Sequence, residues 1–263
     1  MLYTNCQLSI IVELMHPDKA ICIYSGEGVG ERSLDSAVSS FKESFEDLPI
    51  KLITPKEVID GKWKNDCLIF VMPGGADIPY LNALAGKGNK EIAAFVHDGG
   101  KYLGFCAGAY YACKEIEFEK GTGLEVVGER ELKFFPAKAV GPAYGIGTYC
   151  YDKPIDSRLS PVIELSSSVT YNIYYSGGCY FEGAERFTTV SIIARYSDIE
   201  GMPAAVVECT VGKGKALLSG VHPEFSHSIV AKYASDRPSL IKEMEIIEKR
   251  RKEFFESLIK RLL

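Results

Sequence analysis

One run of six consecutive apolar residues, at 67–72, constrains the fold of this 263-residue chain more than any other feature. A strand with no polar face is typical of a parallel sheet that helices cover on both sides. Further strand-like runs lie on either side of it, at 20–24, 50–53 and 101–103. Amphipathic helical patterns alternate with these runs, so the sequence predicts an α/β fold with a doubly wound, mostly parallel sheet.

Two helices are expected within this first part. One carries apolar residues at 37, 38, 41 and 45 and begins near Ser33 or Asp35, either of which can cap a helix. The other covers about 91–98 and is stopped by two glycines. In doubly wound sheets, ligands bind beyond the carboxyl ends of the strands. A Gly-rich turn after Tyr24, a Pro-Gly-Gly loop at 73–75 and Cys106 all fall at such ends.

The pattern changes after Cys113, where short strand-like runs are separated by Gly and Pro. We expect antiparallel strands here, with a turn at 211–215, and a segment of about 122–210 that covers part of the strand ends. The expected strands are at 124–127, 162–165, 169–175, 190–196, 204–209 and 216–221. Residues 237–263 read as a charged helix, either packed on the domain formed by residues 1–236 or free to bind a partner.

Composition excludes several classes of function. The net charge of −5 argues against nucleic acid or anionic membrane as a partner. The apolar run at 8–12 is cut by Glu13 and lacks a basic flank, so we expect neither a signal peptide nor a membrane span. Eight cysteines without a CxxC pair indicate reduced thiols in a cytoplasmic protein. The four histidines are dispersed, so we expect no metal and no cofactor.

The segment Gly-Phe-Cys-Ala-Gly at 104–108 joins a buried strand to a helix that continues over 109–113. A Gly-x-Cys-x-Gly turn of this kind is the cysteine form of a nucleophile elbow, in which the residues around the nucleophile must be small. The helix N-terminus and the N–H of Ala107 would favour a thiolate at Cys106. The alternative is a buried cysteine in an ordinary turn between a strand and a helix.

A cysteine nucleophile needs a base, an acid that orients the base, and donors for an oxyanion. His222 follows the last apolar strand, and Glu224 lies two residues on, where an extended segment would point it the same way. The oxyanion donors would be the N–H of Ala107 and an N–H of Gly74 or Gly75. The alternatives are a loop histidine with a structural hydrogen bond and a plain turn at the glycines.

Taken in order, Pro-Gly-Gly at 73–75, Gly-x-Cys-x-Gly at 104–108 and His-Pro-Glu at 222–224 resemble the class I glutamine amidotransferase family. The resemblance implies a flavodoxin-like fold, a Cys106–His222–Glu224 triad, and an oxyanion hole at Gly75 and Ala107. Longer stretches at 72–77, 104–111 and 174–181 are similar to the N-terminal domain of eukaryotic biotin–protein ligases, which is also known as a stand-alone bacterial protein. A Gly-Arg-Gly-Arg-like loop of the ligase catalytic domain is absent from the sequence.

Some positions depart from these families. Tyr110 stands where glutamine amidotransferases carry a Gln that shapes the glutamine site, so glutamine is in doubt as the substrate. A related glyoxalase- and chaperone-like branch has His after the cysteine, where this chain has Ala107. Glu27 would be the acid of that branch, or else a solvated loop carboxylate. The remaining pocket candidates are Asp77 in the first motif and Tyr175, Gly177 and Gly178 in the third.

Two functions remain open from the sequence. The first is an enzyme in which Cys106 attacks an amide or ester carbonyl of a small molecule and forms a thioester. The second is a non-catalytic binding or regulatory module that keeps the pocket. Tyr110 and the charged terminal helix favour this second function. A homo-oligomer or a protein partner is compatible with either.

Overall fold

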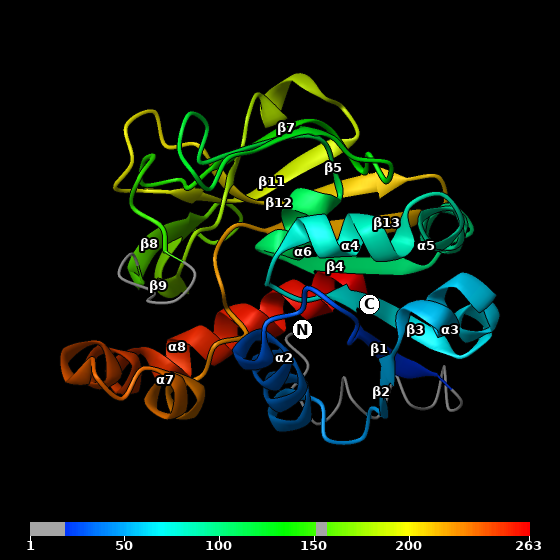
Figure 1. The fold of residues 1–263 in the computed structure, drawn as a ribbon. Helices are drawn as coiled ribbons and strands as arrows, with labels where there is room; N and C mark the ends of the chain where they lie inside the picture. Colours follow the sequence, from blue (N-terminus) through cyan, green and yellow to red (C-terminus); the bar gives the residue numbers. More distant parts are fainter. Residues whose placement is uncertain (1–18, 151–156) are drawn as a thin grey trace.

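A computed structural model describes residues 19–150 and 157–263 (Figure 1). The apolar run at 8–12 therefore lies outside the described residues. Among the residues described, no helix is both long enough and apolar enough to cross a membrane. The seven cysteines in this part of the chain form no disulfide.

The first half of the sheet is parallel, as the sequence predicts. Its strand order is β2-β1-β3-β4-β13, which is the flavodoxin-like order with β13 as the fifth strand. These strands are β1 (Ala20–Tyr24), β2 (Ile50–Ile53), β3 (Cys67–Met72), β4 (Lys101–Phe105) and β13 (Gly214–Ser219). Phe105 at the end of β4 pairs with Ser219 at the end of β13, so the segments that follow these two strands start side by side.

The second half of the sheet is mostly antiparallel and continues from β13 through β12-β10-β7-β5-β6, while β11, β8 and β9 branch from β12. Among the described strands of this half, only β5 and β7 pair in parallel. The strands are β5 (Cys113–Phe118), β6 (Val126–Glu129), β7 (Phe135–Gly141), β8 (Arg158–Glu164), β9 (Val169–Tyr175), β10 (Tyr180–Phe181), β11 (Val190–Tyr196) and β12 (Ala204–Val211). Figure 1 shows these strands beyond the parallel part, on the side where α6 lies.

Helices cover both faces of the parallel strands (Figure 1). One face carries α3 (Pro55–Asp60), η1 (Lys62–Asn65), α4 (Asp77–Leu84), α5 (Lys87–His97) and α6 (Ala107–Tyr111). The other carries α2 (Glu31–Ser44) and α8 (Pro238–Leu262), with α7 (His227–Tyr233) packed on both, and η2 (Ala184–Arg186) lies beside β11. Two separate cores result because side chains alternate along each strand: Tyr102 of β4 faces the first core, and Leu103 and Phe105 face the second.

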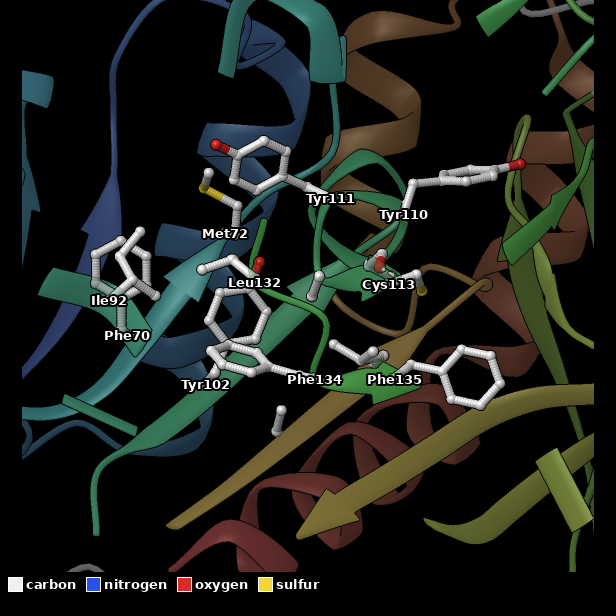
Figure 2. Close-up of a cluster of buried hydrophobic side chains, with 14 of the residues drawn as sticks. Phe70, Met72, Ile92, Tyr102, Tyr110, Tyr111, Cys113, Leu132, Phe134 and Phe135 are labelled. Carbon is white, nitrogen blue, oxygen red and sulfur yellow. Dashed lines mark hydrogen bonds between the residues drawn. The ribbon is translucent and has the colours of Figure 1, made fainter. Parts of the chain in front are cut away.

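The first core is rich in aromatic rings (Figure 2). The ring of Tyr102 stacks with Phe70 at a centroid distance of 6.1 Å and meets Phe134 edge-on at 5.3 Å. Figure 2 also shows the two tyrosines of α6 pointing apart, Tyr111 towards Met72 and Tyr110 away from it. The side chains of these adjacent residues therefore lie in different places. Tyr111 packs in the first core, and Tyr110 points to the site described below.

Several boundaries differ from the predictions. The first helix begins at Glu31 with Gly30 as its cap, so neither Ser33 nor Asp35 caps it. Cys113 starts β5 and does not continue the helix after Cys106, which ends at Tyr111. The last strand of the sheet ends at Ser219, two residues earlier than predicted. The helices α3 and α4 and the strands β5 and β7 were not predicted.

The C-terminal helix α8 is present and packs on the body of the protein. Its apolar face buries Met244, Phe254, Phe255 and Leu258 against the second and third hydrophobic clusters. Arg251, from the basic run at 249–252, lies on this face and is fully buried. A buried guanidinium needs partners, and the site below contains them.

Candidate active site

Cys106 sits in a strained turn between β4 and α6. Its φ is 47° and its ψ is −108°, a conformation that non-glycine residues rarely adopt. Strain of this kind persists only where the surroundings enforce it, and it clusters at functional sites. The turn lifts the side chain off the sheet, leaving Cys106 partly exposed between two buried elements.

The two glycines around Cys106 are required by crowding. A Cβ on Gly108 would lie 2.1 Å from the carbonyl oxygen of Met72, and a Cβ on Gly104 would lie 2.6 Å from that of Gly108. Real Cβ atoms do not approach so closely. Helix α6 therefore packs directly on the backbone of β3 and β4, and this close packing makes the turn at Cys106 sharp.

His222 reaches the same place from β13. Its N–H donates to the carbonyl of Tyr174 at 2.8 Å, which ties the segment after β13 to the end of β9. The ring Nδ1 lies 2.8 Å from Oε1 of Glu224, and both side chains are buried. The predicted extended path is wrong, because the N–H of Phe225 donates to the carbonyl of His222 across a turn. It is this turn that brings the carboxylate back to the ring.

Cys106 and His222 meet at one carbonyl group. The sulfur of Cys106 lies 3.6 Å from the carbonyl oxygen of Ser176, and His222 Nε2 lies 3.4 Å from the same oxygen. A Cβ built on Gly74 would lie 3.3 Å from His222 Cε1 and 3.6 Å from Cys106 Cβ. The missing side chain at Gly74 therefore leaves a notch next to both groups.

The electrostatics favour a charged imidazole. Burial alone would lower the pKa of His222, but the negative charge of Glu224 and hydrogen bonds to Cys106 and Glu224 outweigh it. The net result is a His222 pKa well above the ordinary value of 6.5. Glu224 thus holds a proton on the ring and fixes which nitrogen faces the sulfur.

Two backbone N–H groups next to Cys106 are free. Within the described residues, neither Gly75 nor Ala107 donates its N–H to a protein acceptor. Both residues and Cys106 line a small hollow of approximately 30 Å³. A hollow of this size holds about one water-sized group. The hollow therefore fits a single oxygen atom beside the sulfur.

A larger cavity of approximately 420 Å³ opens on the other side of Cys106. Its polar lining includes Ser33, Ser176 and His222, and its apolar lining includes Tyr174 and Phe225. The first residues of α2 and the loop before it also line it. A substrate with its reacting oxygen in the small hollow would have room for the rest of its atoms only in this cavity.

Tyr110 and Gly177 line the small hollow together with Asp77. The Tyr110 hydroxyl donates to the carbonyl of Gly177 at 3.1 Å, and its ring packs edge-on against Phe118. Asp77 is bound to Arg130 at 2.7 Å, and burial outweighs that ion pair and raises the pKa of the carboxyl. These contacts close the hollow on the side of α6.

The other predicted pocket residues lie elsewhere. Tyr175 is fully buried, and its hydroxyl accepts from the N–H of Ala143 and donates to the carbonyl of Gly178. Gly178 packs so closely on Gly220 that a Cβ would lie 1.7 Å from its carbonyl oxygen. Both residues hold the chain together behind the site. Glu27 is exposed and lines neither the hollow nor the cavity.

Several contributors to the site were not predicted. The sequence suggests only a helix cap for Ser33, which lines the cavity. No sequence pattern indicates Tyr149, which lines both the hollow and the cavity. Arg251 donates to the carbonyl of Pro223 at 2.5 Å and pairs with Glu248 at 2.6 Å. Its seven-residue spacing from Met244 and Leu258 places it on the apolar face of α8, a signal that could have been read. No cluster of metal-binding side chains occurs in the described ranges.

Most of this chain is similar to known proteins. Residues 19–263 match the family model described as "Biotin-protein ligase, N terminal". An uncharacterized protein of Chlamydia muridarum is 34% identical over 257 residues, which cover 92% of this chain and 95% of that protein. The biotin–protein ligase of Schizosaccharomyces pombe is 32% identical over 212 residues, 78% of this chain but only 33% of the ligase.

Among solved structures, a glutamine amidotransferase from Thermotoga maritima shares the fold. The superposition covers 92% of this chain and 97% of that protein, with a TM-score of 0.52 and 12% sequence identity. At this identity the likeness concerns the fold, and it agrees with the flavodoxin-like strand order.

Proposed function

The chain belongs to the family of biotin–protein ligase N-terminal domains, and from that premise we propose that it is a cysteine-dependent hydrolase or amidotransferase that cleaves an amide or ester carbonyl through a thioester. One observation carries the proposal. Cys106 stands in a strained elbow beside His222, whose Nδ1 is bound to Glu224, at the junction of a one-atom hollow and a substrate-sized cavity. The proposal places this reduced-thiol chemistry in the cytoplasm.

The resting pair is a Cys106 thiolate beside the His222 imidazolium, whose Nε2 holds the proton of the thiol. In the first step the thiolate attacks the carbonyl carbon. A carbon–sulfur bond forms, and the carbonyl electrons move to the oxygen, which the N–H groups of Gly75 and Ala107 would stabilise in the small hollow. The negative charge of Glu224 stabilises the imidazolium. The tetrahedral intermediate then expels the amine or alcohol, which takes the proton from His222 and leaves a thioester on Cys106.

In the second step a water molecule or an amine attacks the thioester. His222 takes the proton of the attacking group, the carbon–sulfur bond breaks, and the sulfur leaves as thiolate. Water gives a carboxylic acid, and an amine gives a new amide. The cavity of approximately 420 Å³ provides the space from which this second reactant would enter.

The proposal is tested by intact-protein mass spectrometry. The protein is mixed with a panel of small amides and activated esters, quenched in acid, and compared with Cys106→Ala. We expect a mass increase that equals the acyl group, is confined to Cys106, and decays as product appears. Cys209→Ala is the matched control, because Cys209 is fully buried in β12 far along the chain from the site. No adduct with any member of the panel would reject the enzymatic function.

A second candidate function is a binding or regulatory module, and Tyr110 favours it. Its buried side chain occupies the position at which glutamine amidotransferases carry a Gln, and its hydroxyl donates a hydrogen bond to the carbonyl of Gly177. Such a module would bind a small molecule or a protein partner without turnover. A partner that co-purifies equally with wild type and Cys106→Ala, in the absence of an acyl adduct, would support this function over catalysis.

A further inference from the structure

The N-terminal end of α2 lines the cavity together with His222. From its geometry we infer that this end, with Ser33 and Arg32, binds a carboxylate group of the acyl donor. The inference rests on the proposed function and narrows its substrate class to amides or esters that carry a carboxylate near the reacting carbonyl. It adds a binding role for residues outside the Cys106–His222–Glu224 group.

The end of α2 is open to a ligand. The helix is 14 residues long and starts after Gly30, which offers no side chain to cap it. The N–H groups of Gly30 and Ser33 already donate to carbonyls at 3.2 and 3.0 Å, but those of Glu31 and Arg32 have no backbone acceptor among the described residues. Together with the helix dipole, these two N–H groups favour an anion. Residues Gly28 to Ser33 supply several of the groups that line the cavity: Gly28, Gly30, Glu31, Arg32 and Ser33.

Ser33 gives the second, independent indication of a ligand. Only 5% of this residue is exposed, yet its hydroxyl has no hydrogen-bond partner among the described residues and it lines the cavity. Because the Ser33 oxygen opens onto the cavity, its hydroxyl can donate a hydrogen bond to a ligand bound there. Ser33 Oγ lies 3.0 Å from the position of a Cβ on Gly74, the same point that is 3.6 Å from Cys106 Cβ. The free hydroxyl is therefore close to the reacting sulfur.

The charges around this end of α2 are biased towards binding an anion. Arg32 lines the cavity, and its guanidinium forms no ion pair with the described residues. Asp35, the nearby acid one turn on, is already bound by Lys232 and by Tyr233 at 2.7 Å. The raised pKa of His222 adds a positive charge to the lining of the same cavity. Glu31 is the opposing charge, and its side chain is exposed to solvent.

The shape of the site fixes which part of a substrate meets α2. The hollow at Gly75 and Ala107 has room for one oxygen, so the rest of an acyl group must extend into the larger cavity. There it passes between the rings of Tyr174 and Phe225 and the start of α2. A carboxylate held by Ser33 and Arg32 would position the carbonyl carbon over the sulfur, which is how binding energy away from the reacting bond assists catalysis.

A pair of reagents that differ only in charge tests the inference. Iodoacetamide and iodoacetate both alkylate Cys106, but only iodoacetate carries a carboxylate. The quantity measured is the rate constant for iodoacetate divided by the rate constant for iodoacetamide at Cys106, both obtained by peptide mass spectrometry at pH 7. We expect a ratio well above that of free cysteine, falling about tenfold in Ser33→Ala and about threefold in Arg32→Gln.

Matched controls lie on the same helix. Ser39→Ala and Lys42→Gln change a hydroxyl and a positive charge on α2 at positions that do not line the cavity, and they should keep the wild-type ratio. Equal ratios in wild type, Ser33→Ala and Arg32→Gln, with rapid alkylation by iodoacetamide, would overturn the carboxylate site and leave the proposed function standing. Alkylation by both reagents no faster than that of free cysteine would instead overturn the proposed function, and the carboxylate site with it.

Discussion

Cys106 and His222 are held in place by opposite means. The elbow at Cys106 is fixed by its near neighbours, since Gly104 and Gly108 pack on backbone within van der Waals distance. The turn at His222 is fixed by distant residues: Ser40 Oγ donates to the carbonyl of Glu224 at 2.7 Å, and Arg251 donates to the carbonyl of Pro223 at 2.5 Å. The nucleophile therefore depends on two glycines of its own turn, one of them packed on the backbone of β3, whereas the side chains that hold the base come from α2 and from the C-terminal helix.

This difference shows which substitutions should disturb the Cys106 elbow and which should disturb the His222 turn. A change in the elbow acts through steric overlap at one point. A change at Arg251 in α8, more than 25 residues after His222 in the sequence, acts on the base, because the Arg251 side chain contacts the His222 turn and not the elbow. Three substitutions distinguish the packing that fixes the elbow from the distant contacts that fix the His222 turn.

The largest effect is expected from Gly108→Ala. The added Cβ would lie 2.1 Å from the carbonyl oxygen of Met72, so α6 must move off β3. We expect unfolding by urea to show a loss of about 4 kcal/mol. Gly123→Ala is the control, because a Cβ there meets nothing within 4 Å, and its effect should stay within about 0.5 kcal/mol. Similar values for the two variants would mean that the elbow is not fixed by packing.

Arg251→Met should come next, with a loss of about 3 kcal/mol. It removes a fully buried charge, leaves the carbonyl of Pro223 without the guanidinium donor, and takes the guanidinium from Glu248, whose carboxylate keeps its hydrogen bond from the N–H of His227. The rate of Cys106 alkylation by iodoacetamide should fall as well, because the base loses its support. Arg250→Met, one residue away but 60% exposed, should change stability by no more than about 0.5 kcal/mol. Equal effects at 250 and 251 would contradict the proposed support of the base by α8.

Glu224→Gln should have the smallest effect on stability, and the effect should depend on pH. The raised pKa of His222 means that the imidazolium stabilises the fold fully below about pH 6.5, and that this contribution is lost as the pH rises through the folded-state pKa. Glutamine keeps the shape but removes the charge, so we expect a loss of about 1 kcal/mol at pH 6.5 that shrinks towards pH 9.

Urea unfolding of wild type, Glu224→Gln and the exposed control Glu245→Gln at several pH values measures this dependence. NMR titration of the imidazole of His222 should show a lower pKa in Glu224→Gln than in wild type. A difference in stability that stays constant from pH 6.5 to 9 would show that Glu224 acts on the turn and not on the charge of the ring.

The same contrast explains how much could be predicted from the sequence. The parallel strands and the elbow follow from local patterns: short apolar runs and a Gly-x-Cys-x-Gly turn. The contact between His222 and Glu224 was expected on an extended path, whereas a turn makes it. Local periodicity does not show whether residues two apart follow a strand or a turn.

The strands and site residues that could not be predicted depend on contacts between residues far apart in the chain. The strands β5 and β7 mix polar and apolar residues and gain their partner only from the tertiary fold. Ser33 looked like a helix cap, because nothing local shows that Gly30 starts the helix and that Ser33 meets the cavity. Arg251 belongs to the basic run at 249–252, and only its place on the buried face of α8 distinguishes it from its neighbours.

The central claim is that Cys106 and His222 act as a pair, and the pH dependence of Cys106 alkylation tests it most directly. Rate constants with iodoacetamide are measured by peptide mass spectrometry from pH 5 to 9 in wild type and in His222→Ala. We predict that wild type stays fast at pH 6, whereas the variant becomes fast only near pH 8.5, about where an ordinary thiol ionises. Two superimposable profiles would contradict the pairing.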